Sequence, residues 1–229
     1  MIDAVFFDLD NTLIDFMKVK RASCEEAISA MIDAGLDIRK DAAMKILFEL
    51  YDHYGLEYNK IFQRFLRQTI GRIDWKILAA GIVAYRRIRM GFLEPYPGVR
   101  RTLMTTKLGG IKLGIISDAP KIKAWVRLAS LRFGDFFDVV VTYDDTRKLK
   151  PHSLPFERGL KRLSVAPENA LMVGDRPERD ITGARRVGMK TCFARYGAER
   201  EYRNVRADYV IDDIKDLLGI IAKENSQKG

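Results

Sequence analysis

The sequence is poor in cysteine and histidine, the residues that most often build disulfide frameworks and soft-metal sites. It has two of each in 229 residues. Cys24 and Cys192 are far apart, and neither has a cysteine or histidine neighbour at metal-ligand spacing. A disulfide scaffold and a Cys/His metal site are therefore not supported, and we expect both cysteines to be plain buried or semi-buried residues.

Long apolar runs, internal repeats and low-complexity segments are also missing. No apolar run approaches the roughly 20 residues of a membrane span, and Met1 leads directly into a strand-like segment without room for a signal peptide. We therefore expect a cytoplasmic protein without a membrane partner. A hydrophobic content of 47% beside 31% charged residues is typical of a globular chain, long enough for one large domain or a core with an insert.

The formal net charge of +9 raises the question of nucleic-acid binding. The basic residues are mixed with acidic ones along the chain, and no RNA- or DNA-binding motif accompanies them. We expect no nucleic-acid partner. A basic surface that attracts small anionic substrates explains the charge better.

The most informative stretch is the first fifteen residues. The run Ala4-Val5-Phe6-Phe7 is typical of a central parallel strand covered on both faces, and Asp8 and Asp10 follow at its carboxyl end. Ligands bind at that end of open α/β sheets. Two neighbouring carboxylates there call for Mg²⁺ or a basic partner. The same residues also suit a helix N-cap.

Helical periodicity replaces the strand pattern from Phe16 to Gly91, and Pro95-Tyr96-Pro97-Gly98 ends it. Strand-like and helical segments then alternate to the late strand 209–211. The last residues, 223–229, lack apolar side chains and are expected to fray. The pattern predicts an α/β fold with a doubly wound parallel sheet of Rossmann type, formed by 1–15 and 95–229, and an inserted all-helical domain, 16–94.

Three later segments place polar residues where predicted strands end. Ser117 and Asp118 follow the strand 111–116, Lys150 comes just before Pro151, and the strand 170–173 leads to Gly174-Asp175 with Asp180 beyond. A serine can donate to a phosphoryl oxygen, a lysine can neutralise its charge, and an acidic pair supplies oxygen ligands for Mg²⁺. Individually, each also suits a turn, an N-cap or a surface position.

Together, Asp8-Leu9-Asp10-Asn11-Thr12, Ser117, Lys150 and Gly174-Asp175-x-x-x-x-Asp180 resemble the four motifs of the haloacid dehalogenase superfamily. The resemblance covers residues 1–15 and 95–215, and the helical insert resembles the C1-type cap of subfamily I. Within that group the chain is similar to archaeal Mg²⁺-dependent phosphatases.

The resemblance implies a phosphatase in which Asp8 is the nucleophile and forms an aspartyl-phosphate, while Asp10 acts as acid and base. It implies that Mg²⁺ is held by Asp8, the backbone carbonyl of Asp10, and Asp175. Phosphoryl oxygens would be bound by the side chains of Ser117 and Lys150 and by backbone amides around Leu9, Asp10 and Asp118. Behind these, Thr12 would shape the turn, and Asp180 would orient Lys150 or a metal-bound water.

Several alternatives stay open from the sequence alone. A phosphomutase shares the motifs, and a 2-haloacid dehalogenase shares the nucleophile, although it lacks an acid at the position of Asp10. A basic polyanion-binding protein without chemistry is the non-enzymatic alternative, but none of the expected catalytic residues is lost. The expected substrate is a small phosphorylated metabolite such as a sugar or triose phosphate. The sequence does not distinguish a monomer from a homodimer.

Overall fold

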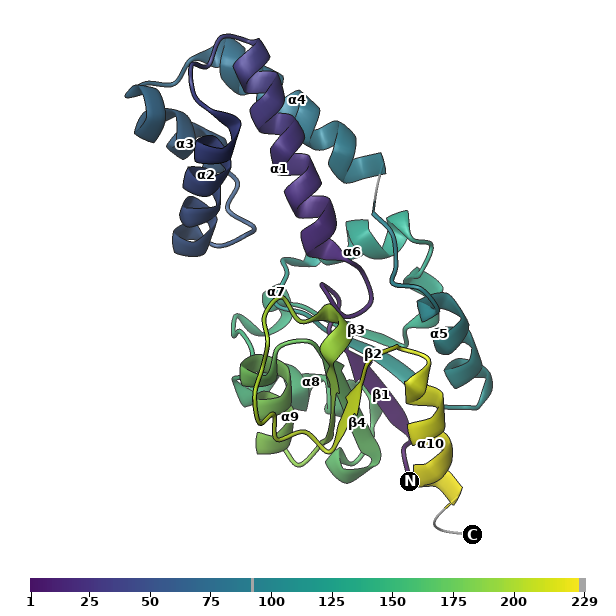
Figure 1. The fold of residues 1–229 in the computed structure, drawn as a ribbon. Coiled ribbons are helices and arrows are strands. Elements are labelled where there is room, and N and C mark those ends of the chain that lie inside the picture. Colours follow the sequence, from purple (N-terminus) through teal and green to yellow (C-terminus); the bar gives the residue numbers. More distant parts are fainter. Residues whose placement is uncertain (92, 227–229) are drawn as a thin grey trace. The chain divides into compact units, whose positions relative to one another are not determined.

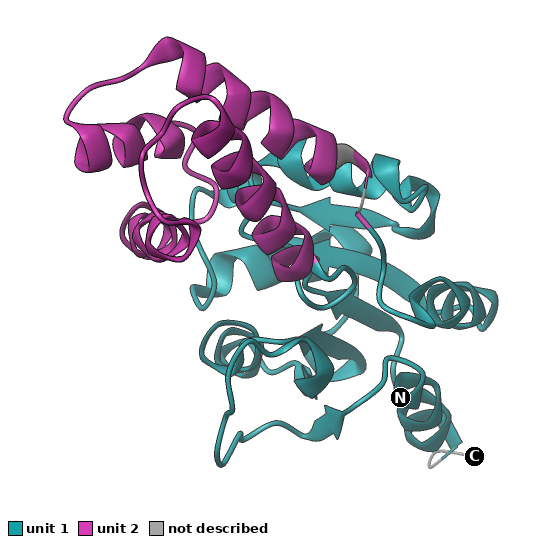
Figure 2. Ribbon diagram, turned by 45° about the horizontal axis from the view of Figure 1, so that its top comes forward, with its two compact units in different colours: residues 1–15, 94–229 teal, residues 16–93 magenta. Residues whose placement is uncertain are grey.

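The computed structural model describes residues 1–91 and 93–226. The chain divides into two compact units, coloured in Figure 2: unit 1 contains Met1–Asp15 and Glu94–Gly229, and unit 2 contains Phe16–Leu93. Among the described residues, no helix has the length and apolar character needed to cross a membrane.

Unit 1 is built on a six-stranded parallel sheet with the order β3-β2-β1-β4-β5-β6 (Figure 1). Its strands are β1 (Ala4–Phe7), β2 (Lys112–Ile116), β3 (Val139–Val141), β4 (Ala170–Gly174), β5 (Lys190–Ala194) and β6 (Tyr209–Ile211). All four residues of β1 are buried, as expected for an unbroken apolar strand with neighbours on both sides. The predicted doubly wound parallel sheet is confirmed.

Helices cover both faces of this sheet. They are α5 (Val99–Leu108), α6 (Lys121–Ser130), α7 (Tyr143–Thr146), α8 (Ser153–Leu163), α9 (Thr182–Arg186) and α10 (Asp216–Ser226). Short turns of helix are η1 (Gly134–Phe136), η2 (Pro167–Asn169), the π-helical η3 (Pro177–Ile181) and η4 (Arg195–Gly197). Figure 1 shows α8 and α9 on one side of the sheet and α5 and α10 on the other. Phe6, Phe156 and Met172 belong to the core that α8 and α9 share with the sheet.

The helices of unit 2 are its only regular secondary structure among the described residues. They are α1 (Phe16–Asp33), α2 (Lys40–Tyr54), α3 (Ile61–Ile70) and α4 (Trp75–Gly91). The apolar stripes meet in a core of their own that includes Met31, Leu47 and Phe65. Gly55 and Gly71 follow α2 and α3 with positive φ angles of 87° and 73°, so glycine ends both helices.

The two segments that flank residues 16–93 are joined within unit 1. Ile14 and Pro95 form an isolated antiparallel bridge, and the backbone N–H of Tyr96 donates to the carbonyl of Leu13 at 3.0 Å. The chain therefore leaves and re-enters unit 1 at adjacent points.

The expected fraying of residues 223–229 is wrong for its first part, because α10 continues to Ser226. Asn225 fixes the end of this helix: its side chain accepts from the Ile2 N–H at 2.6 Å and donates to the Ile2 carbonyl at 3.2 Å. Glu224 also contacts Lys190 and Tyr209. Polar contacts thus replace the missing apolar ones. Residues 227–229 lie outside the described part of the chain.

Candidate active site

Three adjacent strands bring the predicted residues to one edge of the sheet. Asp8 follows β1, and its backbone N–H donates to the Val173 carbonyl of β4 at 2.9 Å. Ser117 follows β2 and Asp175 follows β4. Since parallel strands end on the same side, residues more than 100 positions apart in sequence meet here.

A tight turn follows Asp8 and holds Leu9 and Asp10. The Leu9 carbonyl accepts hydrogen bonds from the N–H groups of Leu13 and Ile14 at 3.1 and 3.3 Å, and the Leu9 side chain is buried. Asn11 has a φ of 60°, a left-handed conformation that asparagine tolerates better than most residues. This turn directs the chain away from the sheet immediately after the two aspartates.

Lys150 is the cation at the centre of the site. Its Nζ lies 2.6 Å from Asp8 Oδ1 and 2.5 Å from Asp180 Oδ1, and it donates to the Ile116 carbonyl at 3.0 Å. The residue is only 5% exposed. Burial alone lowers the pKa of a lysine, but the charges of Asp180 and Asp8 outweigh it and raise the pKa of Lys150. Lys150 is therefore a fixed positive charge beside Asp8.

Asp175 is a buried carboxylate that lies close to two others. It is 1% exposed, and burial, together with the charges of Asp8 and Asp180, raises its pKa to about 9. Thr12 Oγ1 lies 3.2 Å from Asp175 Oδ1 as a donor, whereas the buried Oδ2 atom has no hydrogen-bond partner. A buried carboxylate oxygen of this kind calls for a cation.

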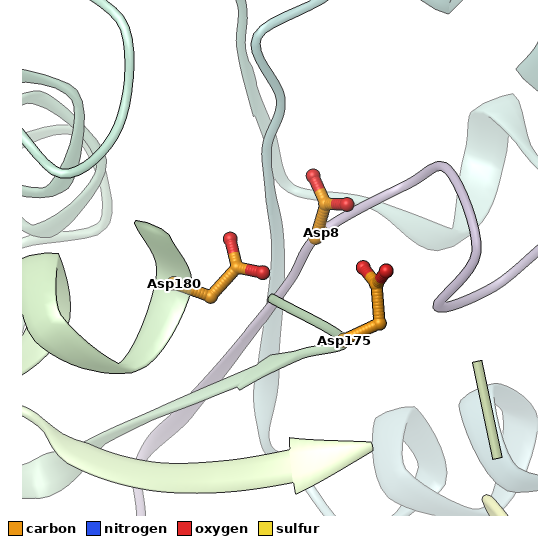
Figure 3. A group of neighbouring side chains, drawn as sticks. All are labelled: Asp8, Asp175 and Asp180. Carbon is orange, nitrogen blue, oxygen red and sulfur yellow. The ribbon is translucent and has the colours of Figure 1, made fainter. Parts of the chain in front are cut away.

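The carboxylates of Asp8, Asp175 and Asp180 form a cluster whose oxygen atoms lie within 4.8 Å of one another (Figure 3). The Oδ1 atom of Asp180 pairs with Lys150, and its Oδ2 atom accepts from the Arg176 N–H at 3.0 Å. Burial, and then the nearby Asp8, raise its pKa despite Lys150. Asp180 is thus engaged on both oxygens, which leaves Asp8 and Asp175 as the better-placed ligands. This donor set fits Mg²⁺, which prefers one or two carboxylates.

Ser117 and Asp118 line the site from β2. The Ser117 N–H donates to the Val141 carbonyl at 2.9 Å, and its Oγ accepts from the Ala119 N–H at 3.2 Å, so the hydroxyl proton is still able to donate. Asp118 accepts from the Lys150 N–H at 2.9 Å and pairs with Arg179. Asp118 therefore fixes the backbone that carries Lys150.

Asp10 is paired with a residue that we did not single out from the sequence. Arg127 Nε of α6 lies 3.1 Å from Asp10 Oδ1, and the Arg127 side chain is 4% exposed. A sequence signal exists, because Arg127 falls three residues after Ala124 and one before Leu128 on the buried stripe of α6. A charged residue on a buried helical stripe needs a partner.

A second layer, also missed from the sequence, holds the turn after Asp8 from outside. Glu199 Oε1 accepts from Asn11 Nδ2 at 2.9 Å and pairs with Arg176 at 3.0 Å. The Tyr196 hydroxyl donates to the Thr12 carbonyl at 2.7 Å. These contacts link the turn after β1 to the loop after β4. They come from the irregular segment that follows β5, where no periodicity marks them.

The arrangement suits chemistry on an anion. The Asp8 carboxylate lies beside the buried ammonium group of Lys150, a second carboxylate lies two residues further along the chain, and an acidic cluster is suited to a divalent cation. Phosphoryl transfer needs positioning and charge neutralisation of this kind.

Comparison with known proteins supports this interpretation. Residues 2–188 match the family model of haloacid dehalogenase-like hydrolases. The chain is 39% identical to a glyceraldehyde 3-phosphate phosphatase of Pyrococcus furiosus, covering 98% of this chain and 95% of the relative. It is 36% identical to the protein of that name from Methanocaldococcus jannaschii, covering 96% and 97%. A crystal structure of a phosphatase from Thermococcus onnurineus matches with a TM-score of 0.70 at 29% identity, covering 96% and 98%.

Proposed function

Because the chain belongs to the haloacid dehalogenase-like hydrolase family, we propose that it is a Mg²⁺-dependent phosphatase that forms an aspartyl-phosphate on Asp8. The observation that carries this proposal is the position of Lys150, buried between Asp8 and Asp180 where adjacent parallel strands end. A fixed cation beside a carboxylate nucleophile offsets the repulsion between that carboxylate and an anionic phosphate ester.

The reaction has two steps. In the first, a carboxylate oxygen of Asp8 attacks phosphorus, the ester P–O bond breaks, and Asp10 gives its proton to the leaving alkoxide. In the second, Asp10 takes a proton from water, the water oxygen attacks phosphorus, and inorganic phosphate leaves as the Asp8 carboxylate is restored. Splitting one displacement into two lowers the barrier of each.

The phosphoryl oxygens need donors around Asp8. Lys150 Nζ, the Ser117 hydroxyl and backbone N–H groups of the turn at Leu9 and Asp10 are placed in the segments that surround it. Thr12 supports Asp175 through its hydroxyl, and Asp180 orients Lys150. These two residues act through others and do not touch the substrate.

Asp8, Asp175 and the Asp10 carbonyl would hold Mg²⁺. The unpartnered Oδ2 atom of buried Asp175 and the raised pKa of this residue support the assignment, since a divalent cation would satisfy both. When bound, the ion supplies positive charge that polarises the phosphoryl group and orients it.

We further propose a triose phosphate as substrate and assign its selection to unit 2, the cap. The names of the archaeal relatives, glyceraldehyde 3-phosphate phosphatases over nearly their whole length, support this choice. The decisive measurement is phosphate release from a panel of triose phosphates, sugar phosphates and pyrophosphate, with Mg²⁺ and with EDTA. We expect Mg²⁺-dependent preference for a triose phosphate. Transfer to a second sugar phosphate without phosphate release would identify a phosphomutase.

Substitution of the two aspartates tests the mechanism. Asp8→Asn should reduce turnover to background while circular dichroism and the melting temperature stay close to wild type, because the isosteric amide cannot attack phosphorus. Asp10→Asn should slow alkyl phosphates more than p-nitrophenyl phosphate, whose leaving group needs little protonation. Retained turnover in purified Asp8→Asn, or equal losses for both esters in Asp10→Asn, would refute the respective role.

A further inference from the structure

Helix α6 departs from the usual distribution of side chains at four positions. Its outward positions carry Ile122, Trp125 and Val126, which are 71%, 42% and 56% exposed, whereas Arg127 is 3% exposed. An arginine is almost never fully buried without a partner, because removing its charge from water is costly. The position of Arg127 therefore calls for a reason beyond packing.

The contact with Asp10 supplies that reason. Arg127 Nε lies 3.1 Å from Asp10 Oδ1, and the Asp10 side chain is 25% exposed. Arg127 lies on helix α6, which packs against η1 and α7, whereas Asp10 belongs to a turn. The planar guanidinium group fixes the direction of its partner better than a flexible ammonium group does.

We propose that Arg127 is a positioning residue that holds the Asp10 carboxylate in the orientation required for proton transfer to and from the reacting oxygen. The inference rests on the proposed phosphatase function, in which Asp10 is the acid and base. A proton-transfer group must lie within hydrogen-bond reach of its target, and a displacement of about 1 Å can cost on the order of 100-fold in rate. Arg127 acts through Asp10 and does not touch the substrate.

This role predicts a selective defect. Loss of Arg127 should lower kcat/KM most for the esters whose leaving group most needs a proton. A structural role would affect all esters alike, because it would change the amount of working enzyme or the geometry of the whole site. The leaving-group dependence therefore separates the two.

The experiment compares wild type, Arg127→Met and the control Arg101→Ala, which removes an exposed charge from α5. The kcat/KM is measured with Mg²⁺ for phenyl phosphate and for p-nitrophenyl phosphate, whose leaving group is much less basic. We expect Arg127→Met to lower the value for phenyl phosphate about tenfold or more and that for p-nitrophenyl phosphate less than about threefold. Arg101→Ala should leave both unchanged.

The same substitution in the Asp10→Asn background completes the test. If Arg127 acts through Asp10, Arg127→Met should not change the ratio of the two kcat/KM values further. Equal losses for both esters, or a further change of the ratio in that background, would overturn the proposal. If Arg127→Met does not fold, Arg127→Lys is judged by the same ratio. Failure of the proposed function itself would appear separately, as wild-type turnover that is independent of Mg²⁺ or survives in Asp8→Asn.

Discussion

Gly197 shows how closely the active-site turn is packed by residues outside the motifs. A Cβ atom at this position would overlap the backbone carbonyl of Asn11 and lie 3.3 Å from the Asp175 side chain. The φ of Gly197 lies outside the left-handed region, so its backbone conformation does not require glycine. Glycine is needed here because the Asn11 backbone approaches so closely. Any larger residue must push the turn that carries Asp10 away from η4.

Gly197→Ala should therefore lower kcat/KM at least about tenfold and destabilise the protein by roughly 1–3 kcal/mol, as overpacking against backbone does. The matched control is Gly219→Ala in α10, where the added methyl group would meet open space. That substitution should stabilise the protein by roughly 0.5–1 kcal/mol, the advantage of alanine within a helix. Urea denaturation and steady-state kinetics measure both effects. Unchanged kinetics in Gly197→Ala would show that the turn adapts.

The environment of Asp175 predicts that binding of Mg²⁺ increases the stability of the folded protein. Asp8, Asp175 and Asp180 are crowded without enough positive charge, so a cation that binds the folded state stabilises it. Mg²⁺ at about 100 times its Kd should add about 2.7 kcal/mol. Differential scanning fluorimetry with increasing Mg²⁺ should show a rising melting temperature in wild type.

In Asp175→Asn the rise should be absent, because the ligand is lost. Without Mg²⁺ this variant should melt at or above the wild-type temperature, since the amide replaces a carboxyl group whose ionised form is disfavoured by burial and by the nearby Asp8 and Asp180. An undiminished Mg²⁺ effect in Asp175→Asn would place the metal elsewhere.

At the scale of single elements, α7 is a short helix whose stability depends on Asp145. The Thr142 N–H donates to Asp145 Oδ2 at 3.0 Å and the Thr142 side chain accepts from the Asp145 N–H, which together form a capping box. The Thr142 hydroxyl also lies 2.7 Å from Asp145 Oδ2 as a donor. Lys121 and Arg162 pair with Oδ1 at 2.9 and 3.0 Å. Burial raises the pKa of Asp145, but these partners outweigh it and hold the pKa well below its usual range.

A carboxylate with a depressed pKa stabilises the fold at pH values above its unfolded-state pKa of about 4. This stabilisation is lost as the pH falls below that value. Asp145→Asn should therefore cost about 1–3 kcal/mol at pH 7, the range for a cap with charged partners. The difference from wild type should shrink between pH 4 and 2. Denaturant unfolding at several pH values measures it, with exposed Asp135→Asn as the control. A pH-independent difference would show that the charge of Asp145 contributes nothing.

The elements differ in how far the sequence predicts them. The strand Tyr209–Ile211 begins and ends where the sequence pattern places it. Arg127 was within reach of the same reasoning, since it occupies a position on an apolar stripe. Helix α10 was underestimated, because its last turn is held by polar contacts to Ile2 and Lys190, which no local pattern shows.

The roles of Glu199 and Gly197 could not be predicted from periodicity or composition. The Glu199 contact joins residues 188 positions apart, and Gly197 is needed only because Asn11 lies against it. Both depend on how the segment after β5 returns to the turn after β1. Residues within the motifs can be predicted from the local sequence. Residues that support the motifs can be identified only from the tertiary structure.

At the scale of the whole molecule, unit 2 behaves as a separate insertion. It has its own core, and the segments that enter and leave it are joined by the bridge between Ile14 and Pro95. Replacing residues 16–93 by a short Gly-Ser linker should therefore leave unit 1 folded, because a short flexible link can close adjacent ends.

If unit 2 selects the substrate, the shortened protein should retain Mg²⁺-dependent hydrolysis of p-nitrophenyl phosphate. Its discrimination among phosphorylated metabolites should fall at least about tenfold, because the residues proposed to select the substrate are removed. Circular dichroism and kinetics on the same panel test this. Undiminished discrimination would assign selection to unit 1. A full-length variant with an inert linker insertion at an exposed loop serves as the control.

The central position of β1 has a consequence for biosynthesis. The strand that precedes Asp8 leaves the ribosome before the strands that begin at Lys112 and Ala170, with which it pairs. A nascent chain therefore carries Asp8 without its neighbouring strands until β4 has been translated. Long-range parallel pairing of this kind forms slowly and exposes apolar strands meanwhile. Val5-Phe6-Phe7 is thus an apolar segment of the nascent chain that a chaperone can bind until its partner strands are made.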